Sequence, residues 1–161
     1  MLLRDSTATD ADAINRVALA AFDQFKAEYS DWPAMASAYG SMSTLTERGE
    51  IIVAEISGAI AGAVAYIPPD RRKARYFDKS WPVIRMLAVD PRRRGVGIGR
   101  ALTEECIRRA KRDGSDVIAL HTSPIMTIAL SMYLRMGFEL QYEAPPIFGV
   151  PYGVYLKKLA L

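Results

Sequence analysis

The stretch Arg94–Arg100 contains the residues of this chain best suited to chemistry, because three glycines alternate there with small apolar residues. Glycine has no Cβ atom, so its backbone can approach a ligand closely and adopt dihedrals closed to other residues. An apolar segment, Val83–Val89, and an Asp90-Pro91 turn precede the stretch, and a segment of helical periodicity follows it. Free N–H groups and the positive dipole end at a helix N-terminus attract anions. The sequence therefore predicts a phosphate or pyrophosphate site.

The glycine spacing separates three kinds of phosphate-binding loop. A nucleoside-triphosphate loop needs G-x-x-x-x-G-K-[ST], but the sixth position from Gly95 is Arg100. A dinucleotide fingerprint needs G-x-G-x-x-G, and its third glycine would fall on Arg100 or Leu102 in the two available registers. A third pattern, Q/R-x-x-G-x-G/A after an apolar strand, is satisfied in full by Arg94–Gly99.

With this motif the chain resembles the GNAT superfamily of acyl-coenzyme A N-acyltransferases. An L-x-V-x-P strand end precedes the motif, and a helix beginning R-A-L follows it. About thirty residues later comes A-x-x-x-Y-x-R-x-G-F, which spans Ala129–Phe138 and looks like the second signature of the family. The resemblance covers nearly the whole chain in the order of its elements, and it is residue-specific from about Val83 to Phe138.

The resemblance implies how acetyl-coenzyme A would be held as the acyl donor, with no metal ion. The main chain of the central strand would pair with the pantetheine arm, and the backbone near Leu87 would polarise the acyl carbonyl. The N–H groups of the glycine loop would bind the pyrophosphate, with Arg92 and Arg93 nearby for further phosphate contacts. Cofactor binding is thereby expected at Leu87, Ala88, Val89, Arg94, Gly95, Val96, Gly97, Ile98, Gly99, Arg100, Ala129 and Tyr133.

Tyr133 is the expected catalytic residue, as the general acid that protonates the leaving thiolate. A phenol has a pKa near 10 and a thiol a pKa of about 8.5, so the mismatch is small enough for positioning to overcome. The helical spacing predicts that Met126, Ala129 and Tyr133 share one face. The other interpretation of Tyr133 is a buried, hydrogen-bonded core residue.

Two positions depart from the family pattern. Met126 stands where relatives often carry an asparagine that contacts the cofactor arm, and Thr122 or Ser123 could replace that hydrogen bond. Val83 stands where many relatives carry a basic glutamate. The identity of the general base is therefore open. Water-relayed deprotonation is one alternative, and four side chains are the others. These are Glu28, Tyr66, His121 and Glu143; His121 has the most suitable intrinsic pKa.

Length and composition indicate one globular domain, residues 1–161, with 50% hydrophobic and 24% charged residues. The single Cys106 leaves no partner for an internal disulfide and no cysteine-based zinc site, and it is expected to lie in the core. No apolar run reaches the length of a membrane span, so no membrane partner is expected. A cytoplasmic location is the expectation from these features.

The pattern of apolar residues and breakers predicts a single-domain α/β protein with a central mixed, mostly antiparallel sheet flanked by helices on both faces. Val83–Val89, whose only charge is Arg85, is predicted to be a strand covered on both faces. Thr9 is the predicted N-cap of the first helix, and Ala144–Pro151 is a predicted proline-rich loop. Expected strands are 1–5, 51–56, 60–67, 83–89, 117–120, 138–142 and 152–159; expected helices are 10–22, 25–39 (broken), 99–112 and 125–136.

The predicted function is transfer of an acetyl group to a primary amine of a small molecule or peptide, by direct attack in a ternary complex. One alternative is a sensor with the same fold that binds acyl-coenzyme A and transfers nothing. A basic nucleic-acid binder is the other, but its arginines lie on a turn without interleaved aromatics, so no nucleic-acid partner is expected. The resemblance is also consistent with a homodimer formed through the last strands.

Overall fold

A seven-stranded sheet forms the centre of the computed structural model, which describes residues 1–160; Leu161, the last residue of the expected domain, lies outside the described residues. The strand order is β1-β2-β3-β4-β5-β7-β6, and only the β4–β5 pair is parallel. This confirms the expected mixed, mostly antiparallel sheet. The strands are β1 (Leu2–Asp5), β2 (Glu50–Ile56), β3 (Ala59–Ile67), β4 (Val83–Val89), β5 (Val117–Thr122), β6 (Glu139–Ile147) and β7 (Val150–Lys158).

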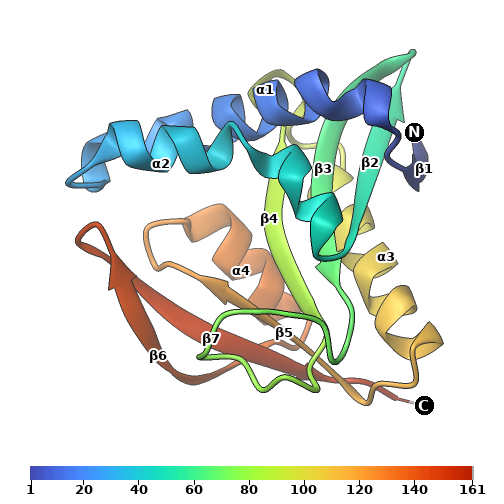
Figure 1. The fold of residues 1–161 in the computed structure, drawn as a ribbon, viewed down its shortest axis with the longest axis vertical. Helices are drawn as coiled ribbons and strands as arrows, with labels where there is room; N and C mark the ends of the chain where they lie inside the picture. Colours follow the sequence, from blue (N-terminus) through green and yellow to red (C-terminus); the bar gives the residue numbers. More distant parts are fainter. Residues whose placement is uncertain (161) are drawn as a thin grey trace.

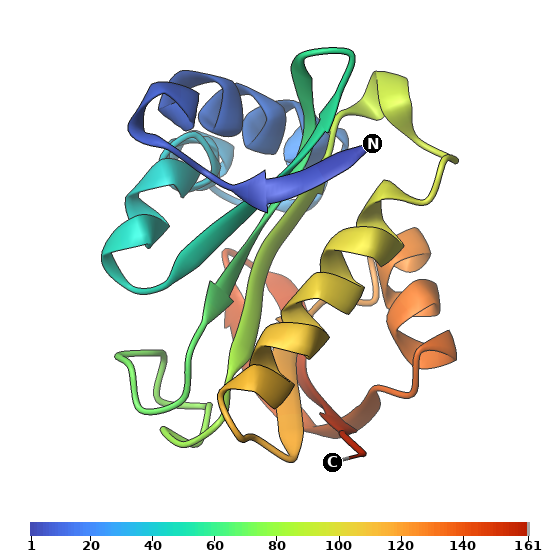
Figure 2. The same ribbon diagram turned by 90° about the vertical axis from the view of Figure 1, so that its right-hand side faces the viewer.

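Helices cover both faces of the sheet, as Figures 1 and 2 show. The N-terminal helices lie over one face and α3 and α4 lie over the other. Two buried apolar clusters follow from this arrangement, one beneath each helical layer. The α-helices are α1 (Ala11–Phe22), α2 (Trp32–Tyr39), α3 (Ile98–Arg112) and α4 (Thr127–Arg135), and the 3₁₀ segments are η1 (Ala8–Asp10), η2 (Asp23–Glu28), η3 (Met42–Glu47) and η4 (Pro91–Arg93).

The N-cap prediction for the first helix was wrong, because a short 3₁₀ segment precedes the helix. The 3₁₀ turn η1 precedes α1, so the N-cap of α1 is Asp10 and the N-cap of η1 is Thr7; Thr9 caps neither. The Thr7 backbone N–H donates to Asp10 Oδ2 at 2.7 Å, while the Thr9 hydroxyl only contacts that of Thr7. Asp10 also accepts from Arg4 at 2.8 Å. Its carboxylate is therefore held by two partners, which stabilises the start of the helical region at Thr7.

The predicted loop Ala144–Pro151 was also wrong, because β6 and β7 continue through it. Phe148 and Gly149, with φ of 44° and 80°, form a two-residue turn between the paired residues Ile147 and Val150. Two positive φ values match the twist that a tight hairpin requires. Pro145 and Pro146 are tolerated because β6 is an edge strand with irregular pairing, where a missing N–H donor costs little.

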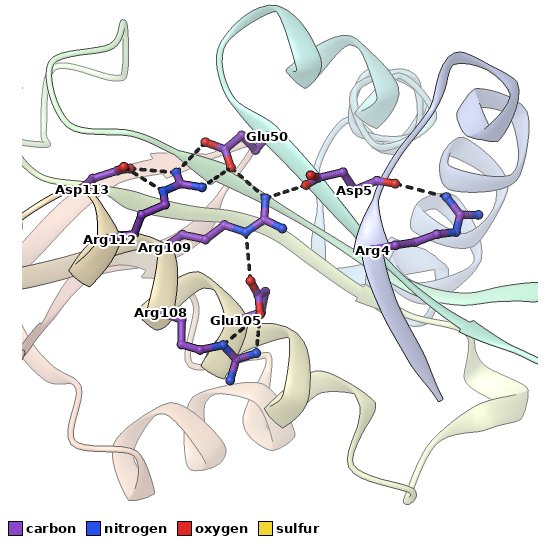
Figure 3. A network of polar contacts seen from close by, with 8 residues as sticks. All are labelled: Arg4, Asp5, Glu50, Glu105, Arg108, Arg109, Arg112 and Asp113. Atoms are coloured by element: carbon purple, nitrogen blue, oxygen red, sulfur yellow. Dashed lines mark hydrogen bonds and ion pairs between the residues drawn. The ribbon is translucent and has the colours of Figure 1, made fainter.

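Helix α3 is fixed to the sheet by a network of charged side chains, shown in Figure 3. Arg109 contacts three carboxylates, with 2.6 Å to Asp5, 2.7 Å to Glu50 and 3.1 Å to Glu105. Arg112 adds a contact of 2.8 Å to Glu50. These contacts tie the C-terminal half of the helix to β1 and β2, so they also set the direction in which its N-terminus points.

Candidate active site

The first turn of α3 has the backbone geometry of an anion site. Gly95 and Gly97 have φ of +84° and +82°, and a Cβ atom at either position would meet nothing within 4 Å. Glycine is thus required there by conformation and not by crowding. The Gly97 carbonyl accepts from the Ala101 N–H at 3.0 Å, which starts the helix. The N–H groups of Ile98–Arg100 in the first turn therefore have no partner within the helix.

The start of α3 lies against the central strand and α4. A Cβ atom built on Gly99 would be 3.7 Å from both Leu87 Cδ2 and Val89 Cγ2, and 3.8 Å from Met132 Sδ. These are ordinary contact distances, so the glycine loop, the end of β4 and α4 border the same space. The side chains predicted to hold a cofactor are brought together here.

Strands β4 and β5 separate beside this loop. Their parallel pairing is confined to Val83 with Ala119 and Ile84 with Leu120, and Figure 1 shows the two strands diverging beyond it. As predicted, this strand is covered on both faces, because its side chains enter both apolar clusters. Beyond the two paired positions, Ala88 is fully buried and the other four residues are partly buried.

The backbone at the end of β4 is directed into this opening. On the other side, Asp90 N–H donates to Ala61 C=O at 2.8 Å. Main-chain groups alternate in direction along an antiparallel ladder, so those of Val89 point away from β3. A bulge next to Leu87, where Met86 has φ of +56°, twists the strand at this point. The opening therefore offers unpaired hydrogen-bonding groups for an extended ligand.

Tyr133 lies on α4 with its ring buried and its centroid 5.6 Å from that of Phe138. Burial raises the pKa of the Tyr133 phenol, so the hydroxyl stays protonated at neutral pH. No hydrogen bond joins this hydroxyl to another residue in 1–160, and no fully buried polar side-chain atom in that range lacks a partner. The Tyr133 oxygen is therefore reachable from solvent. Ala129 packs against both core clusters, and Tyr133 belongs to the cluster beneath α3 and α4, so both residues border the cleft.

Met126 does not share a helix face with Tyr133, contrary to the prediction. It precedes α4, where φ and ψ of −87° and 64° are not helical, and it packs in the cluster under α1 and α2. The Thr122 hydroxyl lies 3.8 Å from its sulfur, and the Ser123 hydroxyl accepts from Ile125 N–H. Both hydroxyls are buried and engaged locally, which argues against their replacing the asparagine contact.

Of the four side chains considered as a base, His121 alone lies at the point where β4 and β5 separate, one residue beyond Leu120. Burial lowers the pKa of its imidazole to about 4, with a smaller effect from the Arg85 charge, so the ring is neutral at pH 7. Tyr66 donates to Asp113 at 2.8 Å near the far end of α3. Glu28 and Glu143 are exposed.

The arginines before the glycine loop are partly occupied. Arg92 lies 3.0 Å from Asp90, which lowers the pKa of that carboxyl. Arg94 donates to the Ala21 carbonyl at 3.3 Å and so fixes the loop to the end of α1. Cys106 is fully buried, as expected, and burial raises the pKa of its thiol.

Residues 1–160 contain neither a metal-binding cluster nor a membrane-spanning helix. No three His, Cys, Asp or Glu side chains in this range are grouped so as to hold a metal ion. Across the same residues, no helix has the length and apolar character needed to cross a membrane.

Comparison with known proteins decides the family. The model of the acetyltransferase (GNAT) family matches residues 14–138, which include the glycine loop, the central strand and α4. The chain belongs to this family. That assignment confirms the resemblance seen in the two sequence motifs and makes the chain a member of a family of acyltransferases.

Individual curated GNAT relatives are similar to a part of this chain. N-acetyltransferase 8F1 from Rattus norvegicus is 32% identical over 101 residues, which cover 60% of this chain and 42% of that protein. The chain spans less than half the length of this and the other curated relatives that it matches.

Two solved structures share the fold of the whole chain. The paia N-acetyltransferase from Thermoplasma acidophilum, in complex with coenzyme A, has a TM-score of 0.78 at 16% identity and covers 98% of both chains. The putative acetyltransferase yncA from Salmonella typhimurium, with its cofactor acetyl-CoA, has a TM-score of 0.69 at 20% identity, covering 99% of this chain and 94% of that one.

Proposed function

We propose that this chain, as one domain, transfers an acetyl group from acetyl-coenzyme A to a primary amine of a small molecule or peptide. The observation that carries the proposal is the juxtaposition of free N–H groups at the start of α3 with the unpaired backbone of β4. Family membership supports the reaction class. Two structural neighbours, one in complex with coenzyme A and one with its cofactor acetyl-CoA, support the donor.

The residues fit such a donor. Backbone N–H groups of Gly95–Arg100 suit the pyrophosphate, since the open positions at Gly95 and Gly97 leave the backbone accessible. The main chain of Leu87–Val89 suits the amides of the pantetheine arm. The N–H groups of β4 near the bulge stabilise the negative charge that develops on the thioester oxygen.

Tyr133 acts as the general acid. The amine nitrogen forms its bond to the acyl carbon, the carbon–sulfur bond breaks, and the hydroxyl of Tyr133 gives its proton to the leaving sulfur. The raised pKa of this phenol keeps the proton in place until a thiolate develops nearby. The amine must lose a proton as well, either to water or to the neutral imidazole of His121.

We further propose a cytoplasmic setting, no nucleic-acid or membrane partner, and assembly as a homodimer. Light scattering on the purified protein measures the last of these.

Calorimetric titration with acetyl-coenzyme A tests the binding half of the proposal, with ATP, NAD and a short DNA duplex as controls. We expect selective binding of acetyl-coenzyme A. Tight binding of DNA without binding of acetyl-coenzyme A would instead support the nucleic-acid alternative. Thiol release across a panel of amines then measures turnover.

The variant Tyr133→Phe distinguishes a catalyst from a sensor that binds acyl-coenzyme A and transfers nothing. The sensor alternative is supported by Val83, which stands where many relatives carry a basic glutamate. We expect kcat to fall by roughly 10²-fold or more, because general acid catalysis is lost. The affinity for acetyl-coenzyme A should change by less than about threefold, because only one hydroxyl is removed. Tyr155→Phe removes a hydroxyl from the same core cluster and should leave the rate intact. An unchanged rate in Tyr133→Phe removes this residue from its role.

A further inference from the structure

Arg85 carries a positive charge that no group in the described chain neutralises. It lies in the middle of β4, where burial lowers the pKa of its guanidinium. Within residues 1–160 Arg85 makes neither an ion pair nor a hydrogen bond. By contrast, Arg109 of α3, which is also largely buried, contacts three carboxylates. Because no fully buried polar atom in that range lacks a partner, the guanidinium nitrogens of Arg85 still reach solvent. A half-buried, unpaired and accessible arginine is costly unless an anion binds it.

A small pocket opens onto this guanidinium, and its charged lining is entirely basic. Arg48, Arg72 and Lys73 line it together with Arg85, and no Asp or Glu belongs to the lining. Lys73 is already engaged, since its ammonium donates to the carbonyl oxygens of Arg71 and Lys79, each at 2.8 Å. Lys73 is therefore less available to an added anion than Arg85, which has no hydrogen-bond or ion-pair partner within residues 1–160.

Two aromatic rings, one imidazole and three aliphatic side chains form the rest of the pocket wall. The rings of Tyr76 and Phe77 have centroids 5.3 and 5.9 Å from that of His121. Rings of this kind exclude water and strengthen a charge-assisted hydrogen bond. The pocket therefore suits a small organic anion better than a polyanion.

The pocket adjoins the place of acyl transfer. Pairing between β4 and β5 ends at Ile84 and Leu120, so Arg85 and His121 are the first residues past the point of separation. Arg85 shares the α1–α2 face of the sheet with Val83, whereas the glycine loop and α3 border the cleft from the other side. Two strand positions, a rise of roughly 7 Å, separate Arg85 from Leu87.

We propose that the Arg85 pocket binds the carboxylate of the acceptor, so that the substrate amine belongs to an amino acid or a similar small amino carboxylate. This deepens the proposed function and rests on it. The planar guanidinium binds a carboxylate through two parallel hydrogen bonds, which fix both position and orientation. An amine held a few ångströms from that carboxylate is directed toward the bulge beside Leu87.

Direct binding tests the pocket without acetyl-coenzyme A. The twenty N-acetylated amino acids, which are the expected products, are titrated in parallel with their neutral N-methylamides. We expect at least one acid to bind the wild-type protein tenfold or more tightly than its amide. Arg85→Met should abolish this preference. Arg75→Met should retain it, because Arg75 is an exposed arginine in the segment before β4 and does not line the pocket. Equal affinity of acids and amides for the wild type overturns the proposal, as does a preference that survives Arg85→Met.

Turnover provides the second test, with each amino acid compared with its decarboxylated amine. In Arg85→Met we expect KM for the amino acid to rise at least tenfold, while kcat/KM for the amine changes by less than about twofold. An equal loss for both acceptors means a structural role and overturns the proposal, and a stronger response to phosphoethanolamine than to any amino acid overturns the carboxylate assignment. Absence of acetyl-coenzyme A binding contradicts the proposed function alone, because the product titrations do not depend on it.

Discussion

Two residues of the cleft, Tyr133 and His121, are held by burial in their neutral forms. For Tyr133 the neutral form is the proton donor, which suits an acid. For His121 it is the proton acceptor, but the lowered pKa makes the imidazole a weak one. An anion beside Arg85 offsets the charge that contributes to this lowering, so acceptor binding and the basicity of His121 are linked.

His121 should make the folded protein sensitive to acid. Its pKa is about 4 in the folded protein, against about 6.5 in an unfolded chain, so the unfolded state binds more protons between these values. The contribution to stability is complete above pH 6.5 and is lost as pH falls toward 4. Urea unfolding at pH 7 and 4.5 should show the wild type losing about 2 kcal/mol more than His121→Gln. Equal losses contradict the burial of a neutral imidazole.

Gly97 should be required for donor binding through its backbone. Gly97→Ala forces a Cβ atom onto a residue with φ of +82°, which costs about 1 kcal/mol and distorts the first turn of α3. We expect at least tenfold weaker binding of acetyl-coenzyme A by calorimetry. Gly114→Ala is the matched control, because Gly114 has φ of +78° in equally open space at the other end of the helix. It should lose similar stability and keep its affinity; equal loss of affinity in both variants contradicts the assignment.

At the scale of elements, α3 does two jobs with its two ends. Its N-terminus supplies the free N–H groups of the cleft, and its C-terminal half is joined by ion pairs to β1 and β2 (Figure 3). The first function depends on the second, because a shift of the helix moves every N–H group of the loop. The start of the helix also lies close to β4, since a Cβ atom built on Gly99 would be 3.7 Å from the side chains of Leu87 and Val89.

Loss of Arg109 should therefore weaken the fold more than loss of its neighbour. The Arg109 side chain is 12% exposed and contacts three carboxylates, whereas that of Arg108 is 63% exposed and contacts Glu105 only. Arg109→Met removes a largely buried cation from a network in which Glu50 keeps only Arg112 and Glu105 keeps only Arg108, and it should cost about 2 kcal/mol in urea unfolding. Arg108→Met should cost less than about 0.5 kcal/mol. Similar losses would mean that the network contributes little.

At the scale of the whole molecule, β4 and β5 join two parts of the sheet through only two paired positions. Strands β1–β4 lie on one side of this seam and β5–β7 on the other. A donor that pairs with β4 and contacts α4 spans the seam, so its binding should stabilise the fold as a unit.

Acetyl-coenzyme A should accordingly raise the melting temperature. At one hundred times Kd, mass action adds about 2.7 kcal/mol, which corresponds to roughly 5–10 °C for a domain of this size. Scanning fluorimetry measures the shift, and ATP at the same concentration serves as the control. An equal shift with ATP contradicts selective recognition of the donor.

Local signals in the sequence determined much of this protein. The motif Arg94–Gly99 identified the turn before α3, because its demand for positive φ is local. Apolar periodicity located the strands and helices to within a few residues, because one face of each is buried. Prolines misled the prediction at Ala144–Pro151, because their effect depends on whether a strand lies at an edge.

Tertiary structure alone decided which distant side chains meet. The sequence showed Arg85 as one charge in an apolar strand, and only the divergence of β4 from β5 leaves it half-buried without a carboxylate. The environment of His121 and the separation of Met126 from Tyr133 arise in the same way, from packing between elements distant along the chain. Burial and charge compensation are sums over such neighbours, so no local pattern of residues contains them.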